Sequence, residues 1–129
     1  MAAIDIVQAI KLLRKLGQKI EKLKWRGTFD DQKVDVKRFH FSLVANQARI
    51  TTEFGIVAAT HTLQATYSLT DRESDEIQFD GREVEEDDVR FDLDVHLFYA
   101  TLEYWFVFVD EAGARHELRL EARVPWSEL

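Results

Sequence analysis

The sequence contains no cysteine and a single proline, and its five glycines are scattered rather than clustered. Without cysteine the chain forms no disulfide and performs no thiol chemistry, which is compatible with a reducing compartment. The glycines stand at positions 17, 27, 55, 81 and 113, so there is no glycine-rich loop of the kind that binds phosphate. Serine- and cysteine-based catalytic signatures are also missing. We therefore predict that the protein is not an enzyme and uses no cofactor.

Long apolar runs are absent as well. The longest run, Tyr104–Val109, is far shorter than the roughly 20 residues that a membrane-spanning helix needs. The first residues do not combine a basic stretch with an uninterrupted apolar run, which is the pattern of a secretory signal peptide. We predict a cytoplasmic protein with no transmembrane segment.

The chain nevertheless contains ample material for one hydrophobic core. Of its 129 residues 46% are hydrophobic, and nine Phe, three Tyr and three Trp supply large rings. This length is typical of one domain, and the charged share of 32% is that of a folded rather than a disordered chain. We predict a single domain over residues 1–129.

Charge divides the chain into two parts. Residues 1–27 carry a net charge of +5 and residues 28–129 carry −12, which together give the overall −7. An acidic body repels the phosphate backbone of nucleic acids, so we predict no nucleic-acid partner. The acidic run from Asp71 to Asp94 either forms a solvated face or attracts a basic partner.

Residues 4–25 are predicted to form one amphipathic helix, because apolar residues recur there at steps of three and four and basic residues fall on the opposite side. Gly17 lies inside the apolar arc, which a helix tolerates if another backbone packs closely there. Gly27 is the predicted stop signal. We expect the apolar arc to cover a sheet; docking on an anionic membrane or in a partner's groove are the alternatives.

From about residue 34 to residue 125 the pattern alternates, as it does in half-buried strands. Short polar segments join the strands, which favours antiparallel neighbours. The predicted fold class is α+β, with one N-terminal amphipathic helix packed on a strongly twisted antiparallel meander sheet or half-barrel of six to eight strands. The alternation places strands at Phe39–Ala45, Ala48–Phe54, Ile56–Leu69, Ile77–Phe79, Val89–Leu97, Phe98–Val109 and Leu118–Val124.

Several local signals refine this pattern. The phase of the alternation changes near Lys37, which predicts a bulge or a strand start. Gly55 predicts the turn or bulge after the second strand, and Asp80-Gly81 is a strong signal for a tight hairpin turn. Residues 71–76 are polar and charged, and we predict a loop there.

The stretch Thr101–Val109 is apolar on both faces. One face is expected to meet the helix, whereas the other needs a second layer, a barrel interior or another subunit. We predict that the outward residues Trp105, Val107 and Val109 form an interface with a partner protein or with a second copy of the chain.

His61 lies in the apolar phase of its strand. It is either a neutral core histidine bonded to backbone, Tyr or Thr, or a ligand or general base inside a cavity. On the second interpretation, a cavity between the helix and the curved sheet binds a small apolar ligand through His61, Tyr67, Phe91 and Tyr104.

Asp92, Asp94 and His96 alternate along one strand face, about 6.5–7 Å apart. With His40 from another strand these side chains would be suitable metal ligands. Alternation of an amphipathic strand accounts for the same residues, however, so we predict no metal site.

Together these features favour a non-enzymatic protein-interaction module. Such a module would be an adaptor, an immunity-type protein or an assembly accessory protein that binds its partner through its sheet or its charged surfaces. The alternative is a carrier of a small apolar ligand.

Overall fold

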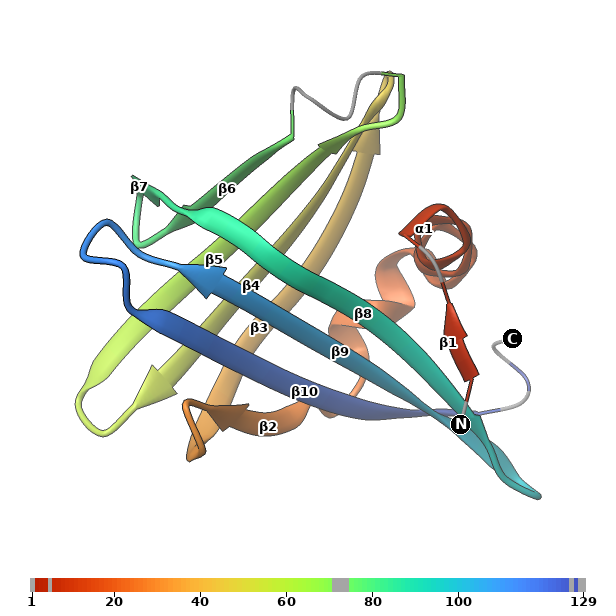
Figure 1. Ribbon diagram of the computed structural model, residues 1–129. Coiled ribbons are helices and arrows are strands. Elements are labelled where there is room, and N and C mark those ends of the chain that lie inside the picture. Colours follow the sequence, from red (N-terminus) through yellow and green to blue (C-terminus); the bar gives the residue numbers. More distant parts are fainter. Residues whose placement is uncertain (1, 5, 71–74, 126, 128–129) are drawn as a thin grey trace.

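A computed structural model describes residues 2–4, 6–70, 75–125 and 127, and it shows one N-terminal helical segment beside a curled antiparallel sheet (Figure 1). The helical segment consists of α1 (Ile6–Leu16) and the 3-10 helix η1 (Gly17–Lys22). No helix in these ranges is both long and apolar enough to cross a bilayer. The strands are β1 (Ala2–Ile4), β2 (Arg26–Phe29), β3 (Gln32–Val44), β4 (Gln47–Ile56), β5 (Ala59–Ser68), β6 (Glu76–Phe79), β7 (Arg82–Glu83), β8 (Glu85–Val95), β9 (Tyr99–Val109) and β10 (Arg115–Pro125).

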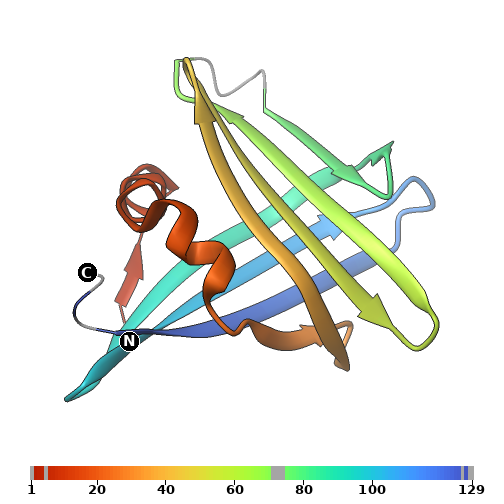
Figure 2. The same ribbon diagram turned by 180° about the vertical axis from the view of Figure 1, so that it is seen from behind.

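The strands follow the order β1-β8-β9-β10-β2-β3-β4-β5-β6-β7, and every pair is antiparallel. The sheet curls into a half-barrel whose two parts diverge toward α1 (Figures 1 and 2). The predicted helix on a curled antiparallel sheet is therefore confirmed. The predicted number of six to eight strands is wrong, because segments as short as β1 and β7 also pair. The meander is interrupted where β10 pairs with β2.

The helical segment is neither continuous nor as long as residues 4–25. Gly17 has φ +57°, and a Cβ added there would meet no atom within 4 Å. Gly17 therefore supplies a left-handed conformation that ends α1, not the predicted close packing. The close approach occurs at Gly27 instead, where a Cβ would lie 1.8 Å from the backbone oxygen of Arg119. Gly27 lies inside β2 and does not end the helix.

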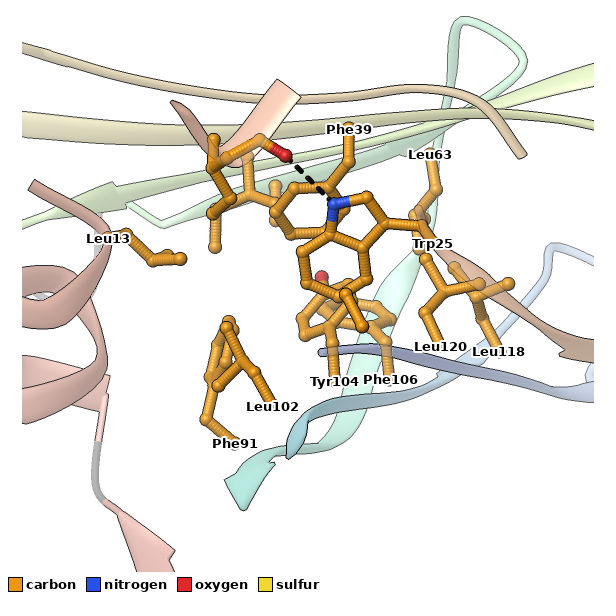
Figure 3. Close-up of a cluster of buried hydrophobic side chains, with 14 of the residues drawn as sticks. Leu13, Trp25, Phe39, Leu63, Phe91, Leu102, Tyr104, Phe106, Leu118 and Leu120 are labelled. Carbon is orange, nitrogen blue, oxygen red and sulfur yellow. Dashed lines mark hydrogen bonds between the residues drawn. The ribbon is translucent and has the colours of Figure 1, made fainter. Parts of the chain in front are cut away.

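The core fills the space between the helical segment and the sheet (Figure 3). Helix α1 packs against β3 and β8, and η1 packs against β3, so the apolar arc covers the sheet as expected. Trp25 stacks on Phe39 with ring centroids 4.1 Å apart. Its indole N–H donates a 3.0 Å hydrogen bond to the backbone oxygen of Ile20. Leu13, fully buried, lies in the same cluster.

The turns follow the local signals in part. The register shifts between Val36 and Arg38, which confirms the predicted bulge. Asp80 and Gly81 have φ of 51° and 80°, as a tight hairpin turn requires. The turn after β4 lies beyond Ile56, with Val57 at φ 54°, so the prediction at Gly55 is wrong. Within the predicted 71–76 loop, residues 71–74 lie outside the described residues.

Candidate functional site

A row of basic and aromatic side chains crosses the outer face of β8, β9, β10, β2 and the start of β3. Arg90 is in register with Trp105, and Trp105 is in register with Arg119. The row continues through Thr28 to Lys33. Because adjacent strands lie about 4.8 Å apart, these side chains are direct neighbours.

Trp105 is held between two guanidinium groups at the centre of this row. The Cζ atoms of Arg90 and Arg119 lie 4.4 Å and 5.2 Å from the centre of its ring. Both arginines are fixed by acidic side chains on their own strands, since Arg90 Nε donates to Asp88 Oδ2 at 3.0 Å and Arg119 Nε donates to Glu117. The result is an aromatic side chain framed by positive charge, an arrangement stabilised by cation–π attraction.

An acidic row lies beside the basic one. Asp92 is in register with Glu103, Glu103 with Glu121, and Glu121 with Arg26. Arg26 Nε donates to Glu121 Oε1 at 2.8 Å. Partial burial raises the pKa of the Glu103 carboxyl, and the charges of Asp92, Glu121 and Asp94 raise it further. Positive and negative groups therefore alternate across this face from one row to the next.

These two rows line a surface hollow of about 710 Å³. Because Gly27 has no Cβ, the backbones of β2 and β10 approach closely where it lines the hollow. The lining residues supply guanidinium, ammonium, carboxylate and indole groups, and they include no serine or cysteine nucleophile. They are Arg26, Gly27, Thr28, Lys33, Arg90, Asp92, Glu103, Tyr104, Trp105, Arg119, Leu120 and Glu121.

The three predicted interface residues lie on β9 and differ in exposure. Trp105 and Val109 are half-buried, whereas Val107 is fully buried. Val107 is in register with Asp88 of β8 and with Glu117 of β10, so neighbouring strands flank it on both sides. Trp105 is the member of this set that lines the hollow. The interface itself stays a prediction.

Three of the four predicted ligand-binding residues lie in the packed interior. Tyr67, Phe91 and Tyr104 are each about 1% exposed, and the rings of Phe91 and Tyr104 are 4.8 Å apart. The Tyr67 hydroxyl donates a 2.8 Å hydrogen bond to Glu86. Burial raises the pKa of both tyrosines above the usual range. Binding of a small apolar ligand here stays a prediction.

The structure places His61 apart from these three residues. Its Nδ1 lies 2.7 Å from Asp80 Oδ2, and its side chain is 28% exposed. Asp80 Oδ1 also accepts a hydrogen bond from the Thr62 backbone N–H at 2.8 Å. His61 is therefore not the buried core histidine bonded to Tyr or Thr that the sequence suggested, because its partner comes from the turn after β6.

His116, for which the sequence held no signal, is bonded on both ring nitrogens. Nδ1 lies 2.7 Å from Asp30 Oδ2, and Nε2 lies 2.8 Å from Asp110 Oδ2. Its ring stacks on Phe29 at 5.6 Å. Only a protonated imidazole donates to two carboxylates at once. Partial burial lowers the pKa of His116, but the bonds and charges of Asp30 and Asp110 outweigh this and raise it overall.

The residues weighed as metal ligands do not converge. His96 Nε2 lies 3.2 Å from the Thr101 hydroxyl and 3.5 Å from Asp94 Oδ2. His40 is bonded instead to Glu21 of η1, at 2.6 Å. Within the described part of the chain, no three His, Cys, Asp or Glu side chains form a group that could hold a metal ion.

Comparisons of this chain with protein-family models, curated proteins and solved structures found no significant match. The surface around Trp105 must therefore be interpreted from its own geometry.

Proposed function

We propose that the protein is a non-enzymatic interaction module that binds a partner protein, or a second copy of itself, through the outer face around Trp105. An adaptor, an immunity-type protein or an assembly accessory protein would use such a surface in the cytoplasm. The contact would centre on the hollow lined by the basic and acidic rows.

One observation carries this proposal: a half-buried Trp105 lies between the guanidinium groups of Arg90 and Arg119 in a surface hollow. Tryptophan and arginine are the residue types most enriched among the side chains that dominate binding energy in interfaces. Alternating charges around such an anchor favour a partner with the complementary pattern.

A second observation concerns hydrogen bonding. The indole N–H of Trp105 is buried and has no acceptor among the described residues. A buried donor without an acceptor costs about 1–3 kcal/mol. A carbonyl or carboxylate of a partner that displaced part of the arginine cover would satisfy this donor.

The test compares two charge reversals on β10. Arg119→Glu changes the hollow, whereas Arg115→Glu changes a similarly exposed arginine of the same strand that does not line it. Affinity purification of the tagged full chain, from cells that produce it, identifies proteins that the wild type retains. Sedimentation over a wide concentration range detects self-association.

Arg119→Glu is expected to weaken the association by about tenfold or more, while Arg115→Glu leaves it near the wild-type value. Equal binding by both variants would overturn the assignment of this face. A strictly monomeric chain with no specific partner would count against any interaction role. A turnover activity abolished by changing one inward polar residue would refute the non-enzymatic role.

A further inference from the structure

The β8–β9 hairpin carries an exposed apolar tip. It projects beyond the neighbouring strands, at the lower right of Figure 1 and the lower left of Figure 2. The turn is closed by a 2.8 Å hydrogen bond from the His96 N–H to the Tyr99 oxygen. Leu97 and Phe98 between them are 82% and 79% exposed, and Val95 is 59% exposed. Large apolar side chains this exposed on a projecting turn are typical of an interaction site.

Basic side chains gather at the base of this tip. A second hollow, of about 680 Å³, is lined by His96 and Tyr99 of the hairpin and by Lys22, Lys24 and Arg123. Arg123 lies 4.6 Å from the centre of the Tyr99 ring.

The cations differ in how they are neutralised. Arg26, which also lines this second hollow, is paired with Glu121. Lys22 and Lys24 are exposed, and no carboxylate of the described residues pairs with either. The second hollow is thus lined by four lysine and arginine side chains and by one carboxylate, Glu121. The base of the tip is therefore locally cationic on a chain with an overall charge of −7.

Most of the acidic run lies far from this surface, whereas Asp94 lies beside the tip, with its Oδ2 3.5 Å from His96 Nε2. Strand β8 begins at the acidic residues 85–88 and ends at Val95 next to the tip. Its length corresponds to about 33 Å at roughly 3.3 Å per residue, which is about four screening lengths at physiological salt. An anionic surface that meets the tip would therefore experience little repulsion from residues 85–88. Of the described residues, the acidic groups close to the tip are Asp94, beside His96, and Glu121, which is paired with Arg26.

We propose that the β8–β9 tip docks on a membrane that contains anionic lipids. Leu97 and Phe98 enter the headgroup region, and Lys22, Lys24 and Arg123 contact the lipid phosphates. A projecting apolar tip can be buried either in a concave pocket of matching shape or in a deformable medium. A lipid bilayer is such a medium. Tyr99 lies just behind the tip, where aromatic rings favour the boundary between lipid and water.

This surface is distinct from the one that a basic helix would offer. The apolar arc of α1 is buried against the sheet, so it does not lie on a bilayer. The inference goes beyond the proposed protein-binding face, because none of the docking residues named above lines the hollow around Trp105. Variants of the two surfaces therefore separate the two proposals.

The test is co-sedimentation of the full chain with vesicles of phosphatidylcholine alone and of phosphatidylcholine mixed with phosphatidylserine. The wild type is expected to bind the anionic vesicles and to dissociate as salt rises. The double variant Leu97→Ser/Phe98→Ser should bind at least about tenfold more weakly. Val57→Ser is the matched control, because Val57 is 101% exposed in the turn between β4 and β5.

Two charge-reversal variants test the role of the basic side chains. Lys24→Glu is expected to weaken binding to the anionic vesicles several-fold, whereas Arg82→Glu makes the same charge change on β7 and should have little effect. Unchanged near-ultraviolet circular dichroism would show that the tip variant is folded. Absent binding, equal binding to both vesicle types, or binding unaffected by Leu97→Ser/Phe98→Ser would overturn the proposal. The proposal would also be overturned if the chain bound an acidic protein through Lys24 and did not bind vesicles.

Discussion

The two ends of the half-barrel are closed by different kinds of contact. At one end, α1 and η1 place apolar side chains such as Leu13 against β3 and β8. At the other end, the rings of Phe29, Phe79 and Phe108 pack with His61 and His116. Aspartates from three separate turns then hold the two histidines.

This difference shows that one end of a curled sheet can be closed by a single helical segment, and the other by side chains from strands and turns far apart in the sequence. The helical end depends mainly on burial of apolar surface, which does not change with protonation. The exposed contacts of Glu21 in η1 with His40 and Arg38 add only a small charged part. The aromatic–histidine end combines burial with charged hydrogen bonds, so part of its stability depends on pH. Three predictions test this contrast.

The largest effect is expected at the helical end. Leu13→Ala removes a fully buried side chain and should lower the free energy of unfolding by about 3 kcal/mol, through lost burial and a residual cavity. Urea denaturation measures this loss, which should be the same at acidic and alkaline pH. Val7→Ala is the control, because Val7 is 54% exposed on the same helix. Equal effects of the two variants would show that α1 does not seal this end.

A smaller effect is expected at the junction of α1 and η1. Gly17 has φ +57° with no atom near its absent side chain, so Gly17→Ala should cost about 1 kcal/mol through backbone strain alone. The sign is informative, because alanine in a continuous helix would instead stabilise the protein by about 1 kcal/mol. Thermal or urea denaturation, with helix content followed at the same time, distinguishes the two outcomes.

The helical end was largely predictable from the sequence, because its signal is periodic and local. The steps of three and four identified the buried arc that includes Leu13 and Ile20. The sequence predicted close packing at Gly17 and the end of the helix at Gly27, however, and the structure shows the reverse. A glycine in sequence does not reveal whether it supplies a left-handed turn, as Gly17 does, or a close approach to a distant strand, as Gly27 does.

The surface around Trp105 was predictable only in part. Alternation identified Trp105 as an outward residue, but it gave no information about which strands are neighbours. Arg90 and Arg119 lie beside Trp105 through the register of β8, β9 and β10. The pairing of His116 with Asp30 leaves no signal in the sequence for the same reason, since the two residues are 86 positions apart.

The last and smallest effect concerns the pH dependence of the aromatic–histidine end. The pKa of His116 is raised above its ordinary 6.5 in the folded protein. Its contribution to stability is therefore complete below pH 6.5 and is lost as pH rises through the folded pKa. Hydrogen bonding to His116 lowers the pKa of Asp110 below its ordinary 3.8. The contribution of the Asp110 carboxylate to stability is therefore complete above pH 3.8 and is lost as pH falls through the folded pKa.

His116→Phe isolates this effect, because phenylalanine keeps a ring against Phe29 and removes both hydrogen bonds. Urea denaturation across the neutral range should show stability declining with rising pH in the wild type and a flatter profile in the variant. NMR titration of the His116 ring should report the raised pKa directly, and Asp110→Asn should lower it. A profile that His116→Phe leaves unchanged would assign the pH dependence to other groups and would remove the contrast between the two ends.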